Sequence, residues 1–76
     1  MVFNLFRGCS RDEKPPDWGI HWTGRRRVAI EAAQPDGVIL QANIPEDLVL
    51  FYTDDMFEDE YIVYPTSSII PTIIPL

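Results

Sequence analysis

A lone cysteine and a lone histidine constrain this chain of 76 residues most strongly, because small proteins usually rely on disulfides or metal sites for stability. Cys9 cannot form an internal disulfide. Cys9 and His21 together cannot supply the four ligands of a structural zinc site. The chain is too short for more than one domain, and its 46% of hydrophobic residues is typical of globular proteins. We therefore expect a single small domain that depends on its hydrophobic core.

Proline positions and composition divide the chain into three parts. Residues 1–17 begin with an apolar segment and continue into a charged stretch with two adjacent prolines, which favour an extended backbone. We interpret them as an N-terminal arm or linker. Residues 18–65 carry strand-like patterns and are expected to form the β domain. Residues 66–76 form an apolar C-terminal arm that contains prolines.

A β-hairpin over residues 26–43 is the clearest local prediction. Apolar and polar residues alternate before and after its centre, as they also do over residues 18–22. The centre is Pro35-Asp36-Gly37, in which the proline sets the φ of the first turn position and the glycine permits a positive φ. We therefore expect a positive φ at Gly37, and a valine there should destabilise the protein.

Two later segments complete the expected sheet. Residues 48–52 are apolar and bounded by turn signals, which favours a strand, although a helix that starts after Pro45 fits the same pattern. Residues 61–64 are β-branched or aromatic and are also typical of a strand. The predicted fold is mostly β: a small antiparallel, partly closed barrel or sandwich of four to six short strands, with extended N- and C-terminal arms.

The C-terminal arm contains a four-residue unit twice, Ile69-Ile70-Pro71-Thr72 and then Ile73-Ile74-Pro75-Leu76. Each proline removes a backbone donor, so the arm cannot be a central strand. Its large apolar side chains are too costly to leave in water. We expect them to pack across a subunit boundary, and the alternative is that the arm covers an edge strand of its own domain. The proposed self-association residues are Ile69, Ile70, Ile73, Ile74 and Leu76.

The net charge of −6 disfavours binding to nucleic acid or to anionic lipid. The acids gather in one run around two apolar residues, which is a reasonable docking surface for a basic partner. The alternatives are an ordinary solvated turn and an imitation of nucleic-acid charge. A metal site is not expected, because the spacing of the acids matches no calcium-binding loop. The proposed partner-binding residues are Asp54, Asp55, Met56, Phe57, Glu58 and Asp59.

Three consecutive arginines near two tryptophans support a rival hypothesis. Basic side chains mixed with aromatic ones can hold phosphates and stacked bases. The alternative is that the arginines face solvent and pair with the many acids. The residues of the nucleic-acid or phosphate-binding hypothesis are Arg25, Arg26, Arg27, Trp18 and Trp22.

Catalysis has little support in the sequence. Cys9 and His21 could form a nucleophile–base pair, but no spacing indicates it, and no phosphate-binding, dinucleotide-binding or zinc-protease motif is present. We expect neither a catalytic site nor a cofactor. Acylation of Cys9 in the apolar N-terminal segment would give only weak membrane contact, so that contact is not expected either.

The sequence therefore indicates a non-enzymatic protein-interaction module, self-associating and able to dock on a partner protein. Residues 1–10 lack the apolar core of a signal peptide, and no apolar run is long enough to span a membrane, so we expect a cytoplasmic location. Small domains with apolar ends are also typical of viral and mobile-element genes, and such an origin is one expectation.

Overall fold

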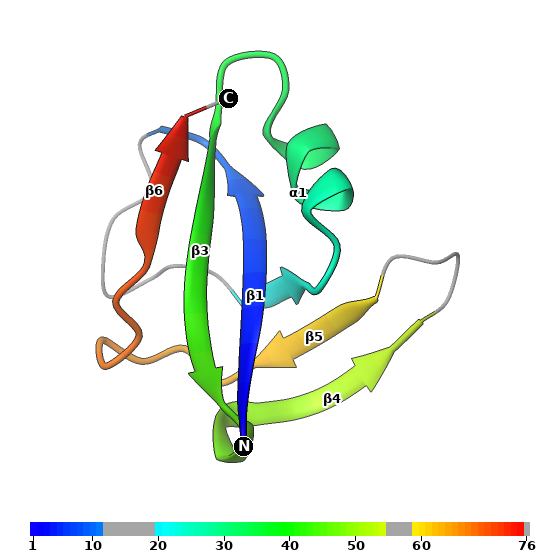
Figure 1. The fold of residues 1–76 in the computed structure, drawn as a ribbon, viewed down its shortest axis with the longest axis vertical. Helices are drawn as coiled ribbons and strands as arrows, with labels where there is room; N and C mark the ends of the chain where they lie inside the picture. Colours follow the sequence, from blue (N-terminus) through cyan, green and yellow to red (C-terminus); the bar gives the residue numbers. More distant parts are fainter. Residues whose placement is uncertain (12–19, 55–58, 76) are drawn as a thin grey trace.

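A computed structural model describes residues 1–11, 20–54 and 59–75 and contains one sheet of six strands (Figure 1). The elements are β1 (Val2–Cys9), β2 (His21–Thr23), α1 (Arg26–Ala33), β3 (Val38–Pro45), the short 3-10 helix η1 (Glu46–Leu48), β4 (Val49–Thr53), β5 (Glu60–Val63) and β6 (Thr72–Pro75). The strand order is β4-β5-β2-β1-β3-β6, and all neighbours are antiparallel. The expected small, mostly β domain is confirmed. Its sheet stays open, because β4 and β6 at the two ends do not pair with each other.

The centre of the sheet is the long pairing of β1 with β3, which runs from Val2 opposite Pro45 to Cys9 opposite Val38. Residues 2–9, which we expected in an N-terminal arm, instead form this central strand. The physical reason is burial, because β1 contributes Leu5 and Cys9 to the hydrophobic core on which a domain of this size depends. The predicted linker at residues 12–17 lies outside the described residues.

The main core lies on one face of the sheet. Trp22 of β2 is the largest side chain in it and is only 1% exposed. Alternate residues of β1 and β3 point into this face, as expected for strands. Its buried members are Leu5, Cys9, Trp22, Val38, Leu40, Ala42, Ile44, Val63 and Ile69.

A second, smaller core lies between helix α1 and the opposite face of the sheet. Ala29 and Ala33, four residues apart on one side of the helix, pack there with Ile39 of β3. The helix contacts mainly β1, with fewer contacts to β3 and β2. Figure 1 shows α1 beside the upper part of β1 and away from β4.

Helix α1 contradicts the predicted hairpin over residues 26–43. Besides the alternating apolar residues, the segment has Ala29 and Ala33 at helical spacing, and its alanines and arginines are strong helix formers. The deciding contact is distant in sequence. Gly8 of β1 approaches the helix so closely that a Cβ atom there would lie 1.9 Å from the carbonyl oxygen of Ala29. The absence of a side chain at Gly8 therefore allows α1 to lie directly on the sheet.

Gly37 also differs from expectation. It does not adopt a positive φ, and it follows the turn after α1 rather than a hairpin turn. The need for glycine is steric, because a Cβ atom would lie 2.3 Å from the Cys9 oxygen and 2.5 Å from the Ala33 oxygen. Its N–H donates to that same Ala33 oxygen at 2.7 Å.

The strands expected at residues 48–52 and 61–64 are confirmed as β4 and β5, with η1 as the preceding turn. Figure 1 shows these two strands running at a steep angle to β1 and β3. The narrow link between the two halves of the sheet explains this angle, because β2 pairs with β1 only at Thr23 opposite Phe6.

The C-terminal arm folds back on its own domain. β6 pairs with β3 from Gln41 opposite Thr72 to Val38 opposite Pro75, and thus covers the outer edge of β3. As the prolines predict, β6 is an edge strand. Ile69, before β6, is buried in the main core. Packing of this arm against a second copy of the chain stays a prediction.

Candidate docking surface at the free edge of β4

β4 lies at one end of the sheet and pairs, among the described strands, only with β5. It carries three consecutive large apolar side chains with high exposure, namely Leu50 at 64%, Phe51 at 61% and Tyr52 at 46%. We expected these residues in a buried strand, and their exposure follows from the place of β4 at the sheet edge. Exposed apolar residues that adjoin one another are typical of interaction sites.

The register places apolar side chains on both faces of β4. Tyr52 lies opposite Tyr61, and Phe51 lies opposite Ile62. Neighbouring residues of a strand point to opposite faces, so Tyr52 and Phe51 face different sides of the sheet. The pairing is irregular between Val49 and Phe51, which leaves Leu50 as an extra residue in a β-bulge.

An aromatic row crosses the sheet on the Tyr52 face. The ring centroids of Tyr52 and Tyr61 are 4.7 Å apart, and those of Tyr61 and Phe3 are 5.2 Å apart. These distances are typical of favourable aromatic pairs. The rings border a shallow groove of about 470 Å³ that also includes Val49 and Glu46. The surface of β4 therefore continues as an apolar groove towards β1.

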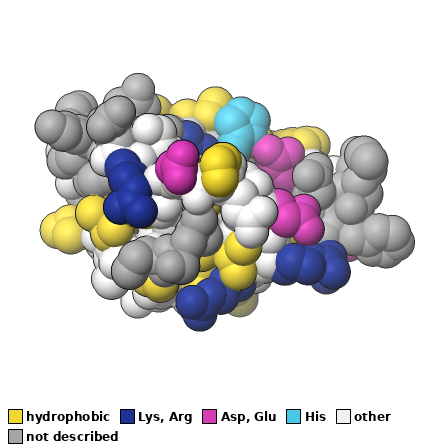
Figure 2. Space-filling view, turned by 90° about the horizontal axis from the view of Figure 1, so that it is seen from above, with side chains coloured by type: hydrophobic (Ala, Val, Ile, Leu, Met, Phe, Trp, Pro, Cys, Tyr) yellow, Lys and Arg dark blue, Asp and Glu magenta, His cyan; other side chains and the backbone are white. Residues whose placement is uncertain are grey.

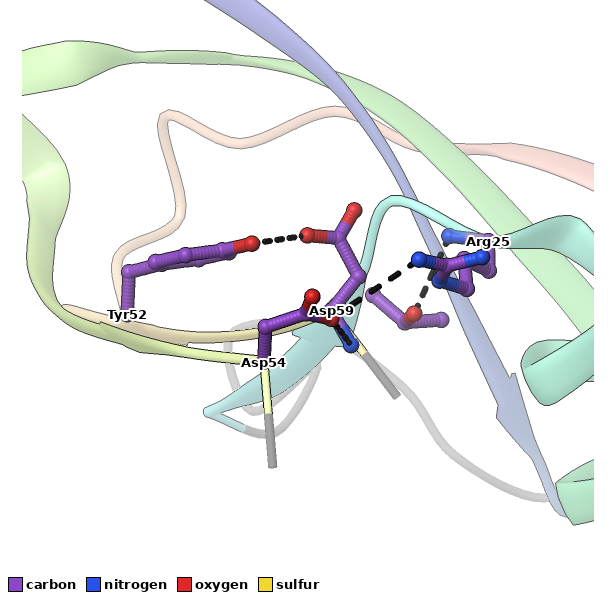
Figure 3. A network of polar contacts seen from close by, with 5 residues as sticks. Arg25, Tyr52, Asp54 and Asp59 are labelled. Carbon is purple, nitrogen blue, oxygen red and sulfur yellow. Dashed lines mark hydrogen bonds and ion pairs between the residues drawn. The ribbon is translucent and has the colours of Figure 1, made fainter. Parts of the chain in front are cut away.

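A polar network closes the β4–β5 hairpin beside Tyr52 (Figure 3). The Tyr52 hydroxyl donates to Oδ1 of Asp59 at 2.5 Å, and the Asp59 N–H donates to Oδ1 of Asp54 at 3.2 Å. Nη2 of Arg25 lies 3.8 Å from Oδ1 of Asp54, and the Gly24 N–H donates to the Asp59 carbonyl at 3.0 Å. Asp59 has a φ of 50°, a conformation that aspartate tolerates better than most residues.

These acids also act on the neighbouring tyrosines. The hydrogen bond to Asp59 is the main cause that raises the pKa of Tyr52 to about 12, and burial and the charges of Asp59 and Asp54 add to it. Burial, followed by the same two charges, raises the pKa of Tyr61 above its usual value. Both hydroxyls therefore stay neutral and able to donate hydrogen bonds at physiological pH.

The acidic run that we proposed as a partner surface adjoins β4. The structure places Asp54 directly after the strand, and Asp59 accepts a hydrogen bond from the Tyr52 hydroxyl. The other four proposed residues, Asp55, Met56, Phe57 and Glu58, lie outside the described residues. Two more exposed acids, Glu46 and Asp47, precede β4 in η1. Sequence reasoning missed the importance of β4 itself, although acids at both ends of an apolar segment could have indicated it.

The described residues of the nucleic-acid hypothesis do not form one exposed surface. Trp22 is buried in the core, so it cannot stack on bases, which contradicts its proposed role. Trp18 lies outside the described residues. Arg25 pairs with Asp54, as the alternative of solvent-facing arginines predicts. Arg26 and Arg27 are exposed in the first turn of α1.

A second pocket, of about 170 Å³, lies between α1 and β1–β2. At its rim, Nδ1 of His21 lies 2.6 Å from Oε2 of Glu60. Figure 2 shows the histidine next to acidic side chains on the upper surface of the molecule. Cys9 points into the main core, on the face opposite to His21, so the two do not form a nucleophile–base pair. Within the described part of the chain, no group of three or more potential ligands could hold a metal ion.

The residues proposed for self-association have different environments. Ile69 is buried and Ile74 is half-buried, whereas Ile70, before β6, and Ile73, within β6, are exposed. Leu76 lies outside the described residues.

Comparison with known proteins gives no match. No protein-family model, no curated protein and no solved structure matches this chain. The expected viral or mobile-element origin stays a prediction. No helix within residues 1–11, 20–54 or 59–75 is long and apolar enough to cross a membrane.

Proposed function

We propose that this protein is a non-enzymatic protein-interaction module that binds a partner protein through β4 and the acids beside it. The observation that carries the proposal is the position of β4 at the end of the sheet, where no second described strand pairs with it, together with the exposed side chains of Leu50, Phe51 and Tyr52. Natural proteins usually protect such an edge, because its free backbone groups and apolar side chains invite another chain to bind.

The opposite edge of the sheet supports this proposal by contrast. The outer strand there, β6, is preceded by Pro71 and ends at Pro75, and proline protects edges because it lacks a backbone donor. β4 contains no proline, lysine or arginine. One edge of the sheet thus carries a protective feature that the other edge lacks.

The capture experiment compares the tagged wild-type protein with two variants in extracts of its source cells. Phe51→Ser removes the central apolar side chain of the surface, and Asp54→Asn removes a charge but keeps the oxygen that accepts from the Asp59 N–H. Gln34→Ser, at an exposed position beyond α1, is the matched control. We expect a partner band with wild type and the control that is lost with Phe51→Ser and weakened with Asp54→Asn. Equal capture by all four proteins would contradict the proposal.

Self-association through the C-terminal arm is a second candidate, supported by the exposure of Ile70 at 85% and Ile73 at 58%. Sedimentation should then show more than one subunit for the wild-type protein and a monomer for the double variant Ile70→Ser, Ile73→Ser. A monomeric wild-type protein would contradict it.

A further inference from the structure

We propose that the partner segment is an extended apolar peptide with lysine or arginine at both ends, which pairs with the free edge of β4 as an additional strand. The inference rests on the proposed function and names the chemistry and the binding mode of the partner. Peptide binding by strand addition is a known mode in which backbone hydrogen bonds supply affinity and side chains supply specificity.

The backbone of β4 has the capacity for a second strand. In an antiparallel sheet, the N–H and C=O groups of alternate residues point to opposite edges of a strand. β5 uses those on one edge of β4, and no other described strand uses those on the outer edge. The bulge at Leu50 disrupts regular pairing in the first part of β4. Phe51 and Thr53 direct their backbone groups to β5, so regular pairing with a peptide is centred on Tyr52, close to Asp54.

The side chains of β4 require a peptide that is apolar on both faces. A residue of the added strand beside Tyr52 lies at the groove that the aromatic row borders. Its neighbours along the peptide lie on the other face, next to Phe51. α1 packs mainly on β1, β3 and β2, so this face of β4 is left to the partner.

Charge determines the ends of the peptide. Acids lie before β4, at Glu46 and Asp47, and after it, at Asp54 and Asp59. Glu46 forms an ion pair with the N-terminal amine at 3.9 Å, and Asp54 forms one with Arg25 at 3.8 Å. Both separations are long, and the groups are exposed. Such surface pairs contribute little and leave the acids accessible to a partner. A peptide with basic residues at both ends is complementary to this arrangement.

The same charges argue against a second copy of the chain as the occupant of this edge. Antiparallel pairing of two β4 strands would bring Glu46 and Asp47 of one copy towards Asp54 of the other. Parallel pairing would bring identical acids together. Like charges that face each other across paired strands are destabilising, and the net charge of −6 adds to the repulsion.

The test uses the wild-type protein and labelled peptides of about ten residues, the length of a long natural strand. The first peptide alternates valine and isoleucine in its centre, so that both faces are apolar, and has arginines at both ends. Its twin has glutamates at both ends instead. We expect the arginine peptide to bind at least about tenfold more tightly than its twin, with a loss of affinity in high salt. Amide NMR shifts on binding should centre on Tyr52. Equal affinity of the two peptides would overturn the charge argument.

Methylation of peptide nitrogens tests the strand geometry without changing the protein. Two methylated peptides are compared. In the first, the N-methyl groups replace the N–H groups that face β4, and in the second they replace the N–H groups that point away from β4. We expect one methylated set to abolish binding and the other to preserve it. Equal binding of both sets, or shifts that map to the pocket between α1 and β1, would overturn the proposed mode.

The remaining outcomes separate this inference from the proposed function. If none of the peptides binds while Phe51→Ser still removes a captured partner, the inference fails and the interaction module stands. If the protein forms a dimer in sedimentation that Phe51→Arg dissociates, the occupant of the β4 edge is a second copy, and the inference is wrong.

Discussion

Tyr52 donates a hydrogen bond of 2.5 Å to Asp59 and thereby joins the end of β4 to the residue that precedes β5. The contact holds the exposed edge strand in place at its acidic end. It also links an aromatic residue of the proposed docking surface to one of the acids that we predicted for that surface from the sequence.

The stability of the protein should fall in alkaline solution because of this contact. The pKa of Tyr52 is raised from 10.0 to about 12 in the folded protein, so the folded state holds the proton more tightly than the unfolded state. The stabilising contribution is complete below pH 10 and is lost as the pH rises through 12. Urea unfolding midpoints measured across this range should fall less for Tyr52→Phe than for wild type. An identical pH dependence in both proteins would contradict the assignment.

The contact of Gly8 with α1 should make this position intolerant of a side chain. Gly8→Ala places a Cβ atom against the backbone of the helix, and we expect a loss of about 1–3 kcal/mol in the free energy of unfolding. Gly24→Ala is the comparison variant, because its Cβ atom would meet the side chains of Asp59 and Tyr61 rather than backbone atoms. Chemical denaturation should show a smaller loss for Gly24→Ala. A larger loss for the comparison variant would disprove the proposed packing of α1.

Two adjacent isoleucines test how the C-terminal arm is attached. Ile69 is 5% exposed and Ile70 is 85% exposed. We expect Ile69→Ala to cost about 2–5 kcal/mol, as in other buried sites, and Ile70→Ala to cost less than about 0.5 kcal/mol. Thermal or urea unfolding of the two variants measures this difference. Similar small losses for both would show that the arm does not contribute to the core.

Several elements could be predicted from the sequence because their signals are local. The β-branched and aromatic residues of β5 indicate a strand by themselves. The prolines of the C-terminal arm restrict it to an edge, where β6 lies.

Helix α1 could not be predicted because its apolar pattern fits two periods. The contact that favours the helix involves Gly8, which lies far away in the chain. The burial of Trp22 could not be predicted for the same reason. The alternation around Trp22 indicates a strand, but it does not show which face of the strand packs into the core. Local sequence does not reveal which residues meet across a sheet.

The acidic part of the candidate site could be predicted from composition, since acids concentrate around residue 54. The exposure of Phe51 could not, because it depends on strand order. An apolar strand in the middle of a sheet is buried, whereas the same strand at an edge presents its side chains to solvent.

Site-specific photo-crosslinking at the two edges of the sheet tests the central claim most directly. A photoreactive phenylalanine analogue replaces either Phe51 on β4 or Ile73 on β6, both of which are exposed, and the protein is irradiated in its source cells. We expect an adduct with a different protein at Phe51, whereas Ile73 gives at most an adduct with a second copy of the chain. An adduct with a different protein at Ile73 and none at Phe51 would contradict the assignment of β4 as the docking edge.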